Sequence, residues 1–150
     1  MSMLLSARDV SKSFGPRHLF EGVSLHVEQG DRIGIIGPNG RGKSTLLKIL
    51  AGLEEPDGGE LTKPRHLRRI YVPQQDAFPH DATPHGVARD AAASGGDLPG
   101  GLDPDTQASI VLSQLGFELQ HEPVNVLSGG WRKRLTLACA LVHEPDVLLM

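Results

Sequence analysis

An α/β fold is predicted by three features of this 150-residue sequence. Residues 32–36 form a short apolar run with three isoleucines, which is typical of a strand. A glycine-rich loop over 37–42 follows, and then apolar side chains at helical spacing over 46–53. The unbroken apolar run at 147–150 has the composition of a parallel strand that is buried on both faces. The order strand, loop, helix, strand predicts a sheet covered by helices.

The rest of the N-terminal half predicts strands separated by turns. Residues 3–27 are β-like, because apolar and polar side chains alternate at the end of that stretch. Turns are predicted at 29–31 and 56–59, where glycine, proline and acidic residues gather. Residues 67–72 predict another strand, which Pro73 ends.

The C-terminal half predicts three helices. Thr83 can cap the first helix, which has proline at its first position and runs to about residue 93. A flexible linker is predicted over 94–102, and a second helix then begins at Asp103–Pro104. The third helix is expected over about 131–143.

Composition and charge exclude several classes of protein. The formal net charge of −3 gives no support for tight nonspecific nucleic-acid binding, which needs a basic face. The single cysteine, Cys139, cannot form an internal disulfide, which favours a reducing compartment. No apolar run reaches the roughly 18 residues that span a bilayer, and the first residues do not resemble a cleavable signal. We therefore expect a cytoplasmic protein without a transmembrane segment of its own.

The strongest motif lies between the strand predicted at 32–36 and the following helix. It reads G-P-N-G-R-G-K-S-T and fits the phosphate-binding pattern G-x-x-x-x-G-K-[ST]. Glycines allow a tight turn whose amides point into one concavity, and the helix adds its positive end. Lys43 offers a charge to the β- and γ-phosphates, and Ser44 offers a hydroxyl to Mg²⁺. A chance glycine-rich turn is the alternative, but the strand before it and the helix after it favour a phosphate site. The predicted phosphate-binding residues are Gly37, Pro38, Asn39, Gly40, Arg41, Gly42, Lys43, Ser44 and Thr45.

A second motif, L-S-G-G-W at 127–131, also opens a helix. Ser128 is a good cap, and Gly129 and Gly130 leave the helix N-terminus bare, which predicts a second anion site. Taken alone, Ser-Gly-Gly would more simply be an ordinary capped helix after a turn.

The two motifs together resemble those of the ATP-binding cassette (ABC) ATPases, and the resemblance covers essentially the whole chain. Tyr71–Gln74 is similar to the Q-loop of that family, and Phe14 stands where the family has an adenine-stacking aromatic. The resemblance implies a P-loop nucleotide-binding domain with a small helical subdomain. Its parts would be an ATP-binding core at 1–75, the helical subdomain at 76–130, and the signature helix with the start of the Walker B strand at 131–150.

The resemblance also implies a role for each matching residue. In the family, two cassettes sandwich two ATP molecules, so Lys43 and its loop would hold ATP with Mg²⁺ while Ser128, Gly129 and Gly130 reach the ATP of the partner cassette. Gln74 and Ser44 would serve Mg²⁺, with Lys43 and Gln74 as the catalytic residues, and Phe14 would stack on adenine.

Two of these assignments, and Trp131 of the second motif, have simpler alternatives. Gln74 could be a plain surface residue, and Gln75 beside it leaves the register open. Phe14 could belong to the core. Trp131 could be a packing residue of the helical subdomain.

Trp131 and the segment 112–117 resemble the ABC-F branch, whose members carry two cassettes on one chain and act on ribosomes. The short stretch between Gln74 and Ser128 departs from that branch, where many members carry a longer arm. We therefore expect an ABC-F-like ATPase that pairs with a second cassette, in cis or as a homodimer, and contacts the ribosome. The alternatives are the ATPase subunit of a transporter with a membrane permease, and a nonhydrolytic ATP-dependent interaction module.

The final run 147–150 resembles the Walker B strand, which two acidic residues follow in the family. Those acids support Mg²⁺ and orient the attacking water. The sequence therefore predicts a fragment that, alone, binds ATP weakly and hydrolyses it poorly. Cys139 also departs from the family, which usually has arginine at the matching position.

Overall fold

The computed structural model describes residues 2–150, which form two compact units. The first unit comprises the residues up to Tyr71 together with Asp146–Met150, and the second is Val72–Pro145. This division differs from the three parts expected from the sequence. The helix expected over about 131–143 packs with the helices that precede it, whereas the final strand pairs with another strand of the first unit.

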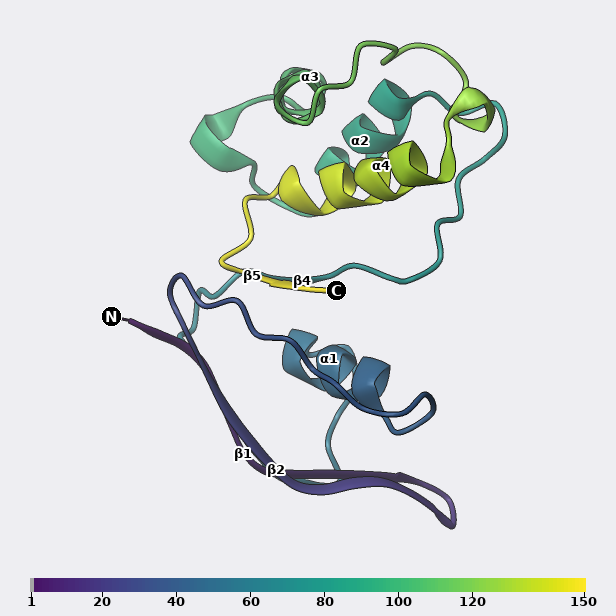
Figure 1. Ribbon diagram of the computed structural model, residues 1–150. Coiled ribbons are helices and arrows are strands. Elements are labelled where there is room, and N and C mark those ends of the chain that lie inside the picture. Colours follow the sequence, from purple (N-terminus) through teal and green to yellow (C-terminus); the bar gives the residue numbers. More distant parts are fainter. Residues whose placement is uncertain (1) are drawn as a thin grey trace. The chain divides into compact units, whose positions relative to one another are not determined.

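The first unit is built on a long antiparallel hairpin of β1 (Met3–Phe14) and β2 (Arg17–Glu28), as Figure 1 shows. The β-like character predicted for residues 3–27 is thereby confirmed. A third strand, β3 (Gly58–Thr62), pairs with the other edge of β1 and gives the order β2-β1-β3. The sequence indicated only a turn at 56–59, because pairing with β1 is a long-range contact that the local composition does not show.

A second, parallel sheet and one helix complete this unit. Strands β4 (Arg69–Tyr71) and β5 (Val147–Leu149) pair in parallel, as the apolar run at 147–150 predicted. Helix α1 (Lys43–Ala51) ends at Gly52 and buries one face in the core of the unit. The most deeply buried members of that core are Leu5, Ala7, Val10, Ile49 and Leu50.

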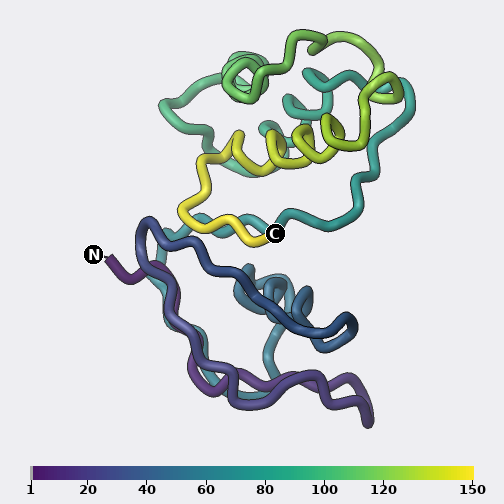
Figure 2. Tube along the Cα trace, viewed as in Figure 1, coloured from purple at the N-terminus to yellow at the C-terminus, as the bar shows by residue number. Residues whose placement is uncertain are grey.

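The prediction of a strand at residues 32–36 is wrong. Figure 2 shows an irregular path from the end of β2 to α1, and residues 31–38 carry no regular secondary structure. Ile33 is 53% exposed and Ile36 is 98% exposed. A strand needs a hydrogen-bonded neighbour, and among residues 2–150 none pairs with this segment. The apolar pattern identified a segment suited to a sheet, but no strand of residues 2–150 lies hydrogen-bonded beside it.

The second unit is helical. It contains α2 (Pro84–Ala93), α3 (Pro104–Gln114) and α4 (Gly129–Leu141). Short 3₁₀ turns η1 (Pro99–Gly101) and η2 (Val124–Val126) lie in the connections, the first of them inside the predicted flexible linker.

Side-chain caps start all three helices, as the sequence predicted. Thr83 Oγ1 accepts from the amide of Gly86 at 3.1 Å, and Asp103 Oδ1 accepts from the amide of Thr106 at 3.0 Å. Ser128 Oγ accepts the equivalent bond at α4, which begins two residues before the predicted start. The helices pack through small residues that are fully or almost fully buried, with larger side chains filling the remaining space: Ala88, Ala92, Ala108, Ala138, Leu112 and Leu135.

Candidate nucleotide-binding site

The loop before α1 is shaped by a glycine that no other residue could replace without strain. Gly42 caps the helix with φ 88°, in the left-handed region. A Cβ at this position would lie 2.8 Å from Phe20 Cδ1 and 3.1 Å from Leu19 Cβ, both on β2. The hairpin therefore packs directly against the backbone of the loop, and a side chain at Gly42 would fill that space.

Three amides at the start of α1 have no acceptor within the helix. The first helical bond is donated by Leu46 N–H to Gly42 O at 2.8 Å, so the N–H groups of residues 43–45 precede the helical ladder. They add to the positive end of the helix dipole. Ser44 and Thr45 occupy the second and third helical positions and are half-buried.

Two cationic side chains donate hydrogen bonds to carbonyl oxygens of this loop. The Lys43 ammonium donates to Gly37 O, which joins the last part of the loop to its first residue. Arg17, from β2, donates through Nη2 to Gly40 O at 2.8 Å. The exposed backbone between them carries Pro38, Asn39 and Arg41. Free amides, an ammonium and a guanidinium around a glycine turn form a cradle that suits a polyphosphate.

Phe14 lies at the end of β1 and is 50% exposed, so the alternative that it belongs to the core is wrong. Lys12 Nζ lies 5.3 Å from the centroid of its ring. Phe14 also pairs across the hairpin with Arg17, the residue that holds Gly40. The aromatic ring and the phosphate loop are therefore connected through the same hairpin.

The second motif opens α4 in the other unit. Ser128 Oγ accepts from the Trp131 amide at 3.4 Å, and Ser128, Gly129 and Gly130 are all exposed. A Cβ at Gly129 would meet nothing within 4 Å, and one at Gly130 would meet only Ser128 Oγ at 4.0 Å. Nothing in the packing of the chain itself therefore requires glycine at these two positions.

The segment after β4 is fastened to α4 by contacts that the sequence analysis missed. Lys133 Nζ donates to Pro73 O at 2.8 Å and to Gln74 O at 3.3 Å, and it lies 3.7 Å from Asp76 Oδ1. The Thr136 hydroxyl donates to the same Asp76 carboxylate. These partners lie about sixty residues apart in the sequence, so no local pattern could have revealed them. Gln74 itself is exposed, and its backbone carbonyl accepts the hydrogen bond from Lys133 of α4.

Trp131 has a packing role. Its ring meets the ring of Phe117 edge-on, with centroids 4.9 Å apart, and Arg134 lies 4.4 Å from its centroid on the same helix. Phe117 is buried in the core of the helical unit. The alternative considered for Trp131, a packing residue of the helical subdomain, is confirmed, and this position gives no independent support to a branch assignment.

Cys139 lies on α4 against the same core, and burial raises the pKa of its thiol to about 11. The thiol therefore stays protonated at neutral pH.

The structure places the predicted site residues in both units. Phe14 and the loop 37–45 belong to the first unit, where β2 brings them together, whereas Gln74 and residues 128–130 belong to the second. In the part of the chain that is described, no helix is long and apolar enough to cross a membrane.

Comparison with known proteins agrees with this geometry. The profile of the family described as "ABC transporter" matches residues 20–150. The ABC transporter ATP-binding protein YfmR of Bacillus subtilis is 34% identical over 180 residues, covering 98% of this chain and 29% of the relative. The zinc import ATP-binding protein ZnuC of Photobacterium profundum is 35% identical over 150 residues, covering 100% of this chain and 56% of the relative.

A solved structure shows the same fold. It is the dimeric post-hydrolysis state of an ATP-binding cassette bound to ADP and Pi, with a TM-score of 0.77 and 24% identity. The match covers 97% of this chain and 72% of that one. The chain thus spans about half the length of the zinc-import relative and less than a third of YfmR. The expected assignment to the ABC-F branch is not supported, because the relatives are named as transporter proteins. The family profile, the phosphate loop before α1 and the shared fold together show that the chain belongs to the ABC transporter ATP-binding family.

Proposed function

We propose that this chain is the nucleotide-binding part of a transporter ATPase, which binds MgATP at the loop before α1 and hydrolyses it when two cassettes associate. The observation that carries the proposal is the cradle at Gly42, which has no space for a side chain and is lined by free amides and Lys43. A bound triphosphate would supply the phosphoanhydride bond that is hydrolysed, while the residues of this chain would bind and orient its phosphates.

The residues of the first unit suit distinct parts of the nucleotide. Lys43 and the amides of 43–45 would hold the phosphates, and the Ser44 hydroxyl would serve as an oxygen ligand of Mg²⁺. Phe14, half exposed at the end of the hairpin, would stack on adenine, a contact worth about 1–3 kcal/mol by analogy with base stacking. Gln74 is proposed as a further residue that serves Mg²⁺, as the family resemblance implies.

The second motif would serve the nucleotide of another cassette. Ser128, Gly129 and Gly130 expose an N-terminus whose glycines are not required by the packing of their own chain. A phosphate approaching from a partner explains why side chains are absent there. The solved relative that is dimeric and holds ADP and Pi supports this arrangement.

A transporter role is favoured over a role on the ribosome. The named relatives include a zinc import protein, whereas the tryptophan that suggested the ABC-F branch is explained by packing. The proposed partner is accordingly a membrane permease, with the cassette on its cytoplasmic side.

The nucleotide site is tested by calorimetric titration of the chain with MgATP. Lys43→Ala should raise the dissociation constant at least tenfold, since a charge-assisted hydrogen bond contributes about 1.5–3 kcal/mol. Lys63→Ala removes an exposed lysine outside the loop and should leave the constant unchanged. Unchanged binding in Lys43→Ala would refute the phosphate-loop assignment.

The choice of partner is tested separately by fractionating cells that produce the tagged protein. Recovery with membranes that contain the cognate permease supports the transporter role. Recovery with ribosomes at equal expression contradicts it.

A further inference from the structure

The aromatic ring that is proposed to stack on adenine is held by a cation of its own strand. Phe14 is 50% exposed, and a side chain that is so open to solvent changes rotamer rapidly unless a neighbour holds it. Lys12, two residues earlier on β1, places its Nζ over the ring at 5.3 Å from the centroid. An ammonium at this distance is attracted to the π face of the ring. A stacking ligand therefore has to use the opposite face.

The Lys12 ammonium is itself fixed by three acceptors from the segment after α1. It donates to Glu55 O at 2.7 Å, and it lies 3.2 Å from Glu54 Oε1 and 3.5 Å from Asp57 Oδ1. Its side chain is 11% exposed. Burial alone lowers the pKa of Lys12, but the hydrogen bond to Glu54 and the charge of Asp57 outweigh burial and raise the pKa. The group over the Phe14 ring is therefore a cation at neutral pH.

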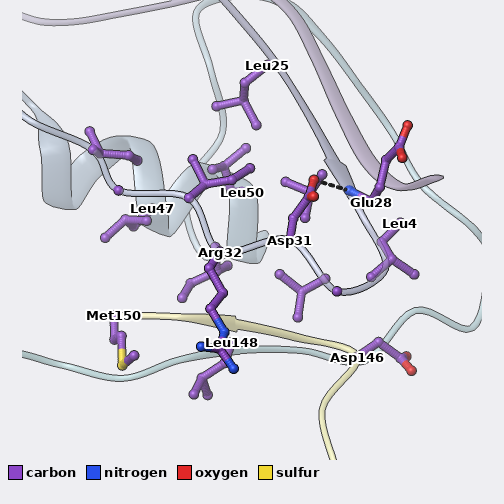
Figure 3. Close-up of a pocket in the computed structure, with 17 residues that line it drawn as sticks. Leu4, Leu25, Glu28, Asp31, Arg32, Leu47, Leu50, Asp146, Leu148 and Met150 are labelled. Carbon is purple, nitrogen blue, oxygen red and sulfur yellow. Dashed lines mark hydrogen bonds between the residues drawn. The ribbon is translucent and has the colours of Figure 1, made fainter. Parts of the chain in front are cut away.

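The segment that carries these acceptors is held at both ends. At its start, Leu47 and Leu50 anchor α1 in the core of the first unit, at the pocket that Figure 3 shows. At its end, the Asp57 amide donates to Ser11 O at 2.9 Å, and the Asp57 carboxylate accepts from the Ser13 amide at 2.7 Å. The acceptors of the ammonium are thus fixed to the strand that carries the aromatic ring.

We infer that Lys12 is a positioning residue for the adenine of bound nucleotide: its ammonium holds the Phe14 ring, and adenine stacks on the opposite face. The inference rests on the nucleotide site proposed above and adds one residue to it. The three N–H bonds of the ammonium match its three acceptors, so Lys12 acts on the base through Phe14 and not by contact with the ligand. Holding the ring in advance lowers the entropy cost of ordering it when the base binds.

A purely structural role is the simpler alternative, in which Lys12 only fastens the segment after α1 to β1. The two roles predict different losses when the cation is removed. A structural role affects the phosphate loop and the base site alike, because both depend on the same hairpin and helix. A positioning role affects only ligands that carry a base.

The test compares MgATP with magnesium tripolyphosphate, which has the phosphates without the base, in calorimetric titrations of the chain. Lys12→Met should raise the dissociation constant of MgATP about threefold to tenfold and leave that of tripolyphosphate unchanged. Lys12→Gln keeps a donor for Glu55 O but removes the charge, so it should show the same difference even if the methionine variant folds poorly. Arg8→Met is the matched control, because it removes another cation of β1, one that pairs with Glu60 at 3.7 Å, and it should change neither constant.

A double-mutant cycle on MgATP alone tests the route through the ring. Phe14→Leu should weaken MgATP binding, and adding Lys12→Met to it should cause no further loss. Equal weakening of both ligands by the Lys12 variants, an unchanged MgATP constant, or a full additional loss in the Phe14→Leu background would overturn the inference and leave the phosphate site standing. A chain that binds neither ligand, or a Lys43→Ala variant that alters neither constant, would instead refute the nucleotide site and the inference with it.

Discussion

The two glycine loops of this chain each expose a helix N-terminus, but their own structure constrains them in opposite ways. At α1 the capping Gly42 has φ 88° and lies too close to Phe20 for a Cβ, so the loop packs directly against its own hairpin. At α4 the capping residue is Ser128, and Gly129 has open space around it. The first loop is therefore held by contacts within its own chain, whereas the second is open, as the proposed contact with another cassette requires.

The largest effect should come from Gly42→Ala. A left-handed backbone costs a non-glycine residue about 1–3 kcal/mol, and the contact with Phe20 adds to it. We expect a lower midpoint in urea unfolding and loss of measurable MgATP binding. Gly15→Ala is the matched control, because its φ of 56° is also positive but nothing lies within 4 Å of its Cβ. Equal loss of binding in both variants would show that the Phe20 contact is irrelevant.

Gly129→Ala should leave the stability of the chain and its MgATP binding intact but weaken the association of two chains. Alanine at an open helical position stabilises by at most about 0.5–1 kcal/mol, so the unfolding midpoint should stay or rise slightly. Binding of MgATP by the single chain should be unchanged. Association of two chains in MgATP, measured by analytical ultracentrifugation, should weaken at least tenfold. A variant that associates normally would contradict the proposed contact with a partner's nucleotide.

The difference between these loops also shows what the sequence could and could not predict. A helix and its cap depend on residues that are close in the sequence, so a local pattern predicts them. The three helices of the second unit begin directly after Thr83, Asp103 and Ser128. Pairings between distant segments leave no local sign, so β3 was missed and the strand expected at 32–36 did not form. For the same reason the contact between Lys133 and Asp76 could not be predicted. Trp131 suggested the ABC-F branch, but in the structure its ring packs on Phe117, a contact that the sequence does not show.

Lys133→Met tests whether α4 holds the segment after β4 in place. The variant removes the bonds to Pro73 O and Gln74 O but keeps a similar length of side chain. Because Lys133 is about half exposed, we expect a loss of only about 0.5–1 kcal/mol in unfolding. Hydrogen exchange at 74–76 should accelerate, and Lys63→Met should change neither quantity. Unaltered exchange there would show that the lysine does not anchor the segment.

The smallest expected effect concerns the Cys139 thiol, which reports on the opening of α4. With a pKa of about 11, roughly one thiol in a thousand is ionised at pH 8, so labelling by a disulfide reagent should be slow in the native chain and fast in urea. Labelling should accelerate as pH rises toward 11. Gly129→Ala should slow native labelling by about twofold to fivefold, the equivalent of about 0.5–1 kcal/mol, and Gly42→Ala should not slow it. Native labelling as fast as in urea would contradict the burial of the thiol.

The open surroundings of Gly129 also make this position a practical attachment point for a fluorophore. A cysteine introduced there would be solvent-exposed, and the chain's only other thiol, Cys139, is protonated and shielded. Maleimide chemistry near pH 7 would then modify the tip of α4 selectively. Since even alanine there is expected to weaken association, the dye would serve to follow the unfolding of α4 in the single chain.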